Sequence, residues 1–175
     1  MKKYCLLLCF LFNFSFASTQ INSGSSFDVG FSPNKGSLDL VLKCINSAKQ
    51  SIEVAAYSFT SKPIAEALYK ASKRGVKVRV VADEKSNARK YSAVTFIANH
   101  NIPTRLNGNY AIFHHKFMII DNMTLETGSF NFSAAAANKN AENVLVLWNT
   151  PQIAAIYENE WVKLWNEAKP LQANY

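Results

Sequence analysis

Cysteine is scarce in this sequence, which has three in 175 residues: Cys5, Cys9 and Cys44. The first two fall in a segment where Lys2 and Lys3 precede an apolar run, as in a signal peptide. Removal of that segment would leave Cys44 as the one thiol, which excludes an intrachain disulfide. It also excludes a cysteine-based structural zinc site, because such sites typically take four nitrogen or sulfur ligands. Apolar neighbours at helical spacing predict that Cys44 is a buried, unreactive thiol.

Long apolar runs are missing as well. The apolar part of the N-terminal segment spans about 13 residues, whereas a membrane-spanning helix needs roughly 20. Ser15-Phe16-Ala17 is a small-x-small sequence typical of signal peptidase sites. We therefore expect a signal peptide at residues 1–17, cleavage after Ala17 and one domain at 18–175. The expected location is periplasmic or secreted, without stable membrane insertion, and the alternative is a retained anchor.

Acidic residues are few relative to basic ones, 12 against 19. Without Lys2 and Lys3, the chain keeps 17 basic residues and a net charge of +5. This excess favours a polyanionic partner, a nucleic acid or an anionic lipid surface, and the alternative is a solvated face. Eight basic residues fall within one stretch of 21: Lys70, Lys73, Arg74, Lys77, Arg79, Lys85, Arg89 and Lys90.

Apolar strand-like runs alternate with helical patterns along the mature chain. This alternation predicts an α/β fold with a mixed, largely parallel β-sheet sandwiched between helices. The expected strands are 27–31, 51–59, 76–82, 103–106, 113–120, 124–129 and 142–148. The expected helices are 36–50, 61–75, 87–99 and a last one that begins at Thr150-Pro151.

Histidine is also rare, with three in the chain, yet two of them are adjacent in the stretch HHKFMIID. On a strand, residues two apart point the same way, so His114 and Lys116 project together and His115 points to the other face. Imidazole is a good nucleophile and acid near neutral pH, and an ammonium attracts phosphate oxygens. The pair therefore suits phosphoryl transfer. A single exposed histidine is more often structural, and we expect His115 and His100 to be non-catalytic.

Polar residues that suit the same chemistry follow in the next segment. Ser129 and Asn131 come after Gly128 at a predicted strand end, and their side chains can donate to non-bridging phosphate oxygens without a metal. Glu142 is expected to accept a hydrogen bond from the second ring nitrogen of His114. Asp121 has the opposite parity to Lys116 and is expected to shape the turn by binding local backbone.

Together these residues have the spacing H-x-K-x4-D-x6-G-S-x-N, from His114 to Asn131. This spacing resembles the signature of the phospholipase D superfamily at every position. The resemblance covers nearly all of the mature chain and is closest to the small, single-motif bacterial endonucleases of the EDTA-resistant periplasmic type. Asn140-Ala141-Glu142-Asn143 also matches that subgroup, with Glu142 at the carboxylate that orients the histidine.

The resemblance implies an αβα sandwich and a two-step hydrolysis in which His114 forms a phosphohistidine. A second histidine must protonate the leaving oxygen, and because the chain holds one signature, the implied solution is a homodimer with the site on its twofold axis. Lys116, Ser129 and Asn131 of both copies would replace metal, so no metal or other cofactor is expected. The expected substrate is DNA, and also RNA, cut without sequence preference. A lipid phosphodiesterase and a noncatalytic DNA-binding or uptake component remain alternatives.

Overall fold

The structure is a computed structural model that describes residues 21, 23–88 and 92–173. The predicted signal peptide and its cleavage site lie outside the described residues. The elements in chain order are β1 (Ser26–Ser32), α1 (Gly36–Ser47), β2 (Ser51–Ala56), α2 (Lys62–Lys73), β3 (Lys77–Asp83), α3 (Glu84–Asn87), α4 (Ala93–Asn99), β4 (Thr104–Asn107), β5 (Lys116–Ile120), β6 (Thr124–Gly128), α5 (Ala134–Asn138), β7 (Glu142–Trp148), α6 (Pro151–Glu167) and β8 (Lys169–Pro170).

All of these strands form one sheet of eight, in the order β1-β7-β6-β5-β2-β3-β4-β8. The mixed α/β architecture is confirmed, but the expectation of a largely parallel sheet is wrong. Five neighbouring pairs are antiparallel and two, β2 with β3 and β3 with β4, are parallel. The reason is connection length: helices join the parallel strands, whereas β5 and β6 are joined by a turn of three residues, too short for a crossover.

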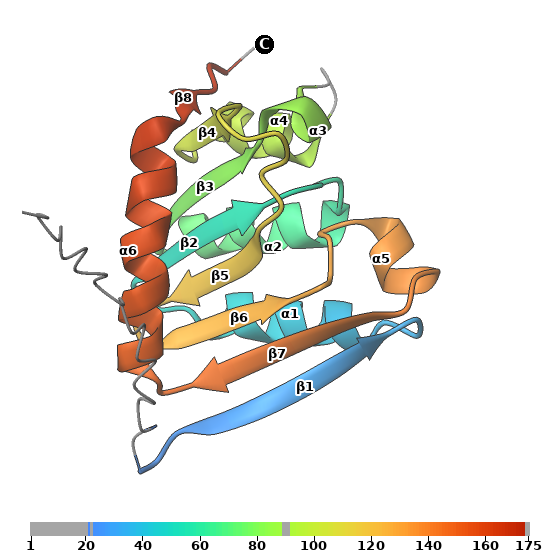
Figure 1. The fold of residues 1–175 in the computed structure, drawn as a ribbon, viewed down its shortest axis with the longest axis vertical. Coiled ribbons are helices and arrows are strands. Elements are labelled where there is room, and N and C mark those ends of the chain that lie inside the picture. Colours follow the sequence, from blue (N-terminus) through green and yellow to red (C-terminus); the bar gives the residue numbers. More distant parts are fainter. Residues whose placement is uncertain (1–20, 22, 89–91, 174–175) are drawn as a thin grey trace, which may run out of the picture.

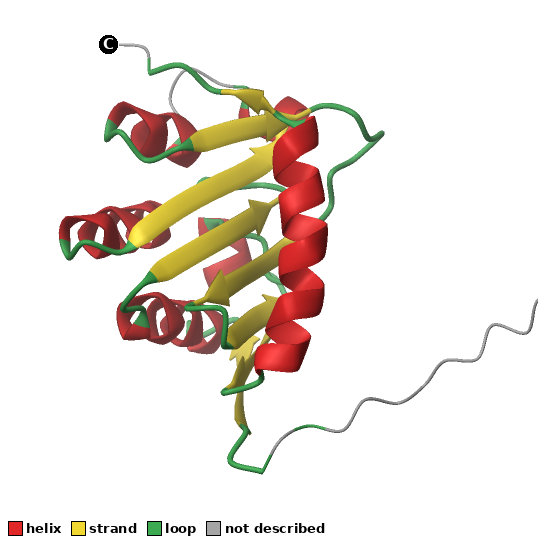
Figure 2. Ribbon diagram, turned by 90° about the vertical axis from the view of Figure 1, so that its left-hand side faces the viewer, coloured by secondary structure: helices red, strands yellow, loops and turns green. Residues whose placement is uncertain are grey.

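Helices cover both faces of the sheet (Figures 1 and 2). The face covered by α1, α2, α4 and α5 carries the larger core, and α6 lies across the other face. The indole of Trp161, fully buried in α6, donates a hydrogen bond to the carbonyl of Val54 in β2 at 3.0 Å. This bond fixes α6 against the centre of the sheet.

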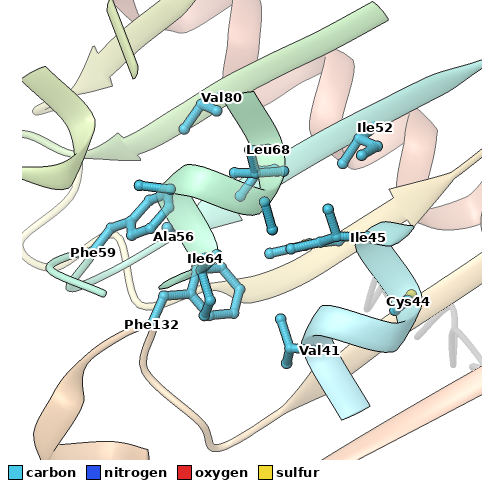
Figure 3. Packing of buried hydrophobic residues seen from close by; sticks show 14 of the residues in the cluster. Val41, Cys44, Ile45, Ile52, Ala56, Phe59, Ile64, Leu68, Val80 and Phe132 are labelled. Atoms are coloured by element: carbon cyan, nitrogen blue, oxygen red, sulfur yellow. The ribbon is translucent and has the colours of Figure 1, made fainter. Parts of the chain in front are cut away.

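The larger core is apolar and continuous between the sheet and its helices (Figure 3). Ile52 and Val80 of the parallel strands meet Ile64 and Leu68 of α2, all fully buried. Cys44 in α1 is also fully buried, as expected, and burial raises the pKa of its thiol well above the usual value. Strands buried on both faces, such as β2 and β3, account for the apolar runs in the sequence.

Several elements are shorter than the sequence predicts. The strand expected at 113–120 begins at Lys116, so His114 lies in the segment that leads into β5. The helix expected at 87–99 is replaced by α3 and α4, each of which has its own N-cap, Asp83 and Ser92. A side-chain oxygen at each cap accepts a backbone N–H, which starts a helix where periodicity alone predicts continuation.

Candidate active site

Four strand ends bring the predicted residues together. β2 and β6 end where β5 and β7 begin: Ala56 pairs with Lys116, and Gly128 pairs with Val144. We call this end of the sheet the site end, and it lies at the right of Figure 1. Lys116 lies at the start of β5 and His114 just before it, Ser129 and Asn131 lie in the segment after β6, and Glu142 lies at the start of β7. Residues separated by 28 positions in sequence therefore share one end of one sheet.

Lys116 is buried, and its ammonium points toward the backbone of His114. The side chain is 7% exposed, and Nζ donates to the carbonyl of His114 at 2.8 Å. Nζ also lies 5.2 Å from the ring centroid of Tyr57. Burial lowers the pKa of Lys116 from its usual value, and the carboxylate of Glu142 opposes that shift. A cation held at this depth is poorly hydrated, which strengthens its attraction for a phosphate oxygen.

His114 is exposed, and its ring packs against Tyr57 with the centroids 4.7 Å apart and the planes at 55°. Within the described residues, the ring nitrogens of His114 make no hydrogen bond. The imidazole is therefore free to meet a substrate. The shared contact with Tyr57 places His114 and Lys116 on the same side of the segment, although His114 itself precedes the strand.

Ser129 and Glu142 form a polar network at the ends of β6 and β7. Ser129 Oγ donates to Glu142 Oε2 at 2.6 Å and accepts from the backbone N–H of Asn143 at 3.1 Å. Asn140 Nδ2 donates to Glu142 Oε1 at 3.0 Å. The bond expected from His114 to Glu142 is not among the contacts of the described residues. The physical reason is strand order, since β6 lies between β7 and β5 and presents the nearer donor.

Asn131 lies two residues beyond Ser129 and is half-buried. Its Oδ1 is buried without a hydrogen-bond partner in the part of the chain that the structure describes. The segment around it is fixed by the carbonyl of Phe132, which accepts from the N–H groups of Thr60 and Ser61, both at 2.8 Å. The loop after β6 is thus tied to the loop after β2, at the side of the site where Tyr57 lies.

Gly128 and Asp121 support this arrangement without facing it. A Cβ at Gly128 would collide with the carbonyl oxygen of Asn143, so the position requires glycine for close strand approach. Asp121 has a left-handed φ of 54°, and its carboxylate accepts from the N–H groups of residues 49, 50 and 51 at 2.7–3.2 Å. The expectation of local backbone bonds is wrong, because these partners are about 70 residues away in sequence. Asp121 instead joins the start of β2 to the end of β5.

The other two histidines make separate contacts. His115 packs between Phe113 and Phe117, with centroids at 5.4 and 5.5 Å; burial lowers its pKa, and Glu160 opposes the shift. His100 ends α4, where Nδ1 lies 2.7 Å from the carbonyl oxygen of Phe96. His115 lines the same pocket as His114 and Lys116, whereas His100 does not.

The basic stretch predicted from the sequence does not form one patch. Because β2 and β3 are parallel, α2 must run from the site end to the opposite end of the sheet. The C-terminal residues of α2 and the start of β3 therefore lie at the opposite end, while Lys85 returns to the site end. Arg79 is bound by Glu53 at 2.9 Å and stacks on Trp161. Arg89 and Lys90 lie outside the described residues.

An open pocket adjoins the site on the α6 side, with a volume of about 370 Å³. His114, Lys116 and Gly128 line it from the sheet, and Tyr157 and Glu160 line it from α6. Among the described residues, no three His, Cys, Asp or Glu side chains gather in a way that could hold a metal ion. His114 and Lys116 bring an imidazole and an ammonium to this pocket, a pair suited to attacking and binding an anion. The hydroxyl of Ser129, the amide of Asn131 and the carboxylate of Glu142 lie at the same end of the sheet, outside the pocket lining.

Tyr57 is a site residue that the sequence pattern does not predict. It follows directly on β2 in an apolar run, a pattern that predicts the interior of a strand. The one indication in the sequence is that a tyrosine at a strand end can present its ring to a neighbouring strand. Asn143 belongs to the predicted Asn140–Asn143 motif, but its bonds to Ser129 were not predicted.

The chain is similar to a known protein family in sequence and to a solved structure in fold. The family described as "Cardiolipin synthase, PLD-like domain" matches residues 41–165. The crystal structure of Nuc, a phospholipase D family member from Salmonella typhimurium, superposes with a TM-score of 0.83 at 46% identity, covering 85% of this chain and 99% of Nuc.

Two curated relatives are similar in sequence over most of the chain. A protein named phospholipase D from Rickettsia conorii is 34% identical over 140 residues, which is 80% of this chain and 70% of that protein. The mitochondrial cardiolipin hydrolase of Mus musculus is 30% identical over 142 residues, which is 81% of this chain and 64% of that protein.

Proposed function

The chain belongs to the phospholipase D superfamily of phosphodiesterases, and we propose that it is a metal-independent endonuclease that hydrolyses DNA, and also RNA, without sequence preference. One observation carries this proposal: the exposed imidazole of His114 lies beside the buried ammonium of Lys116 at one end of the sheet. Among the described residues, no side chain forms a hydrogen bond with this imidazole. The sequence resemblance to small bacterial endonucleases favours nucleic acid as the source of the phosphodiester.

The reaction proceeds in two steps. A ring nitrogen of His114 attacks phosphorus, a P–N bond forms, and the P–O bond to the leaving strand breaks as a second imidazole gives its proton to that oxygen. Water then attacks phosphorus and gives a proton to the second imidazole, and the P–N bond breaks. Lys116, Ser129 and Asn131 bind the non-bridging oxygens and stabilise the transition-state charge, which metals do in other nucleases. Ser129 donates its one hydroxyl proton to Glu142 at 2.6 Å, so the hydroxyl must turn from the carboxylate toward the phosphate in order to bind it.

The second imidazole comes from a second copy of the chain, because one chain carries one such motif. A homodimer with the site on its twofold axis supplies two of each residue. The sheet face that α6 covers supports this proposal. In Figure 1, α6 lies along one end of the strands, so it does not cover the whole of that face. Exposed apolar side chains extend over that face and the neighbouring part of α6: Phe27 at 68%, Val29 at 48%, Phe31 at 65% and Ile156 at 60%. Exposed apolar side chains that line up in this way are typical of a protein–protein contact.

A lipid phosphodiesterase is the second candidate, favoured by the names of the curated relatives. Such an enzyme must accommodate acyl chains beside the phosphate. The pocket next to His114 is open, and Glu160 and His115 contribute polar groups to a wall that also includes Phe117 and Ile156. An open pocket with polar groups suits a nucleic-acid backbone, which remains in water on its outer side.

The proposal includes export: residues 1–17 are removed after Ala17, and the domain at 18–175 acts in the periplasm or outside the cell. Of the helices that the structure describes, none combines the length and apolar character needed to cross a bilayer.

The test uses purified protein beginning at residue 18. Supercoiled plasmid and single-stranded RNA are incubated with it in excess EDTA, and vesicles of phosphatidylcholine or cardiolipin are incubated in parallel. We expect nicking and then fragmentation of DNA under chelation, with a dimer by light scattering. Release of lipid headgroup without DNA cleavage would instead support the lipid enzyme. DNA retention without cleavage would support a binding protein, and loss of cleavage in EDTA would contradict metal independence.

A further inference from the structure

The ring of Tyr57 contacts both members of the His114–Lys116 pair. Its centroid is 4.7 Å from that of the His114 imidazole and 5.2 Å from Lys116 Nζ. Tyr57 comes from the end of β2, and the other two come from the start of β5, so the contact spans two neighbouring strands. Among the described residues, Tyr57 is the one aromatic ring that contacts the His114 ring. This contact limits how the imidazole of the proposed nucleophile can turn.

The backbone of Tyr57 is hydrogen-bonded to the side chain of Asn87, which is 1% exposed. Asn87 Nδ2 donates to the carbonyl of Tyr57 at 2.6 Å and to that of Asp83 at 2.8 Å. Its Oδ1 accepts from the N–H of Phe59 at 3.0 Å. The bonds to Tyr57 and Phe59 fix the backbone on the C-terminal side of the Tyr57 ring, and the bond to Asp83 ties this backbone to the end of β3.

The segment that carries His114 is anchored to the same place. Asp83 Oδ2 accepts from the N–H of Phe113 at 3.0 Å, and Oδ1 accepts from the N–H of Ser86 at 2.7 Å. Asp83 ends β3, and Asn87 ends the short helix that follows. One buried Asp–Asn pair therefore fixes the two segments that bring Tyr57 and His114 together. This bracing is what a reactive group needs when its geometry must be held closely.

We propose that Tyr57 is a positioning residue of the reaction: its ring restricts rotation of the His114 imidazole and favours the ammonium form of Lys116. This inference rests on the proposed function of the site. The negative face of an aromatic ring attracts cations, so the ring opposes the effect of burial on Lys116. The charged and titratable groups around Lys116 include Glu142 at the start of β7, the neighbouring His114 and His115, and Tyr157 and Glu160 of α6, which line the same pocket. The tyrosine hydroxyl has no part in this role, so phenylalanine should replace tyrosine.

The test compares Tyr57→Leu with Tyr57→Phe, and uses Tyr69→Leu as the matched control, since Tyr69 packs on Phe96 and His100 away from the site. Cleavage of bis(4-nitrophenyl) phosphate is followed from pH 6 to 10. In Tyr57→Leu we expect kcat to fall on the order of tenfold or more. We also expect the alkaline fall in rate to move to lower pH by about half a unit, because Lys116 loses the ring. Tyr57→Phe should retain most of the activity and keep the wild-type pH profile.

A second readout needs no substrate. The ¹H–¹³C NMR signal of the His114 ring, assigned with His115→Gln and His100→Gln, carries a ring-current shift from Tyr57. We expect that shift to be kept in Tyr57→Phe and lost in Tyr57→Leu, with unfolding temperatures that show both variants folded. An unchanged His114 signal in Tyr57→Leu, or equal activity losses in the Phe and Leu variants, would overturn the proposal. If the wild type cleaves neither the diester nor DNA, the proposed function fails, whereas the NMR result still decides the contact.

Discussion

The hydroxyl of Ser129 and the carboxylate of Glu142 are joined by a hydrogen bond of 2.6 Å across the ends of two adjacent strands. This bond takes the one hydroxyl proton of Ser129, while the ring of His114 rests on Tyr57. The site is therefore built from two separately supported parts: the proposed nucleophile His114, which rests on Tyr57 after β2, and the polar side chains at the ends of β6 and β7. The expected effects of substitution follow from that division.

The two adjacent histidines should respond differently to removal. We expect His114→Ala to abolish DNA cleavage in EDTA with the fold intact, because the attacking nitrogen is lost. His115→Ala, the matched neighbour, should retain most of the activity, since its ring packs between two phenylalanines instead of against Lys116. Plasmid cleavage and thermal unfolding of both variants measure this. Equal losses of activity would contradict the assignment of the nucleophile.

Removal of the buried cation should slow the reaction without unfolding the protein. We expect Lys116→Met to raise the barrier by roughly 3 kcal/mol, comparable with loss of one oxyanion donor, or more because the proposed dimer would lose two ammonium groups per site. The exposed Lys70 on α2 lies away from the site end, so Lys70→Met is the control and should be near wild type. Steady-state kinetics on a chromogenic diester measure kcat for both, and a less than threefold loss in Lys116→Met would contradict the role.

The rate should fall with rising pH as Lys116 loses its proton. Burial lowers the pKa of this group, so the fall should begin below the usual lysine range, and the active form is the protonated one present at lower pH. Glu142 opposes the shift, so Glu142→Gln should move the alkaline fall to still lower pH. Rate profiles of the two proteins between pH 6 and 10 measure this, and a displacement to higher pH would contradict the expectation.

Stability should depend on Glu126, which is 1% exposed and has no hydrogen-bond partner for either oxygen among the described residues. Burial raises the pKa of Glu126 from 4.5 to about 8 in the folded protein. Between those values the folded state holds a proton that the unfolded state has released, so stability falls as pH rises through this window. The slope from this group approaches about 1.4 kcal/mol per pH unit.

Glu126→Gln should remove that part of the slope. Urea unfolding at pH 5, 6, 7 and 8 measures it, with Glu66→Gln on the exposed surface of α2 as the control that keeps the wild-type slope. Parallel stability curves for Glu126→Gln and the wild type would show that Glu126 does not titrate in this range.

Asp121 should matter for stability more than for chemistry. Its carboxylate accepts three backbone N–H groups from residues 49–51, and Asp121→Ala leaves these donors to water. We expect a loss of about 2 kcal/mol in unfolding free energy, with kcat of the folded fraction unchanged. Chemical denaturation and active-site-normalised kinetics separate the two effects. A large fall in kcat at full folding would show that the residue acts in the reaction.

The sequence by itself determined the α/β class, the approximate strand positions and the spacing from His114 to Asn131. These features are local: apolar alternation, helix caps and a motif confined to 18 residues are all set by neighbours along the chain. It also predicted the burial of Cys44, because helical periodicity shows which face of α1 meets the sheet. The residues of the motif could be predicted to lie together because a tight turn joins β5 to β6, so that these two consecutive strands are also neighbours in the sheet.

Tertiary structure decided what depends on strand order and direction. Whether strands run parallel is set by how the connections pack, and so the sheet is mainly antiparallel and the basic stretch is divided between its two ends. The same order places β6 between Glu142 and His114, joins Asp121 to residues 49–51, and brings Tyr57 against His114 from 57 positions away. Such contacts have no local pattern, because the residues meet only when the sheet has formed and their side chains share one end of it.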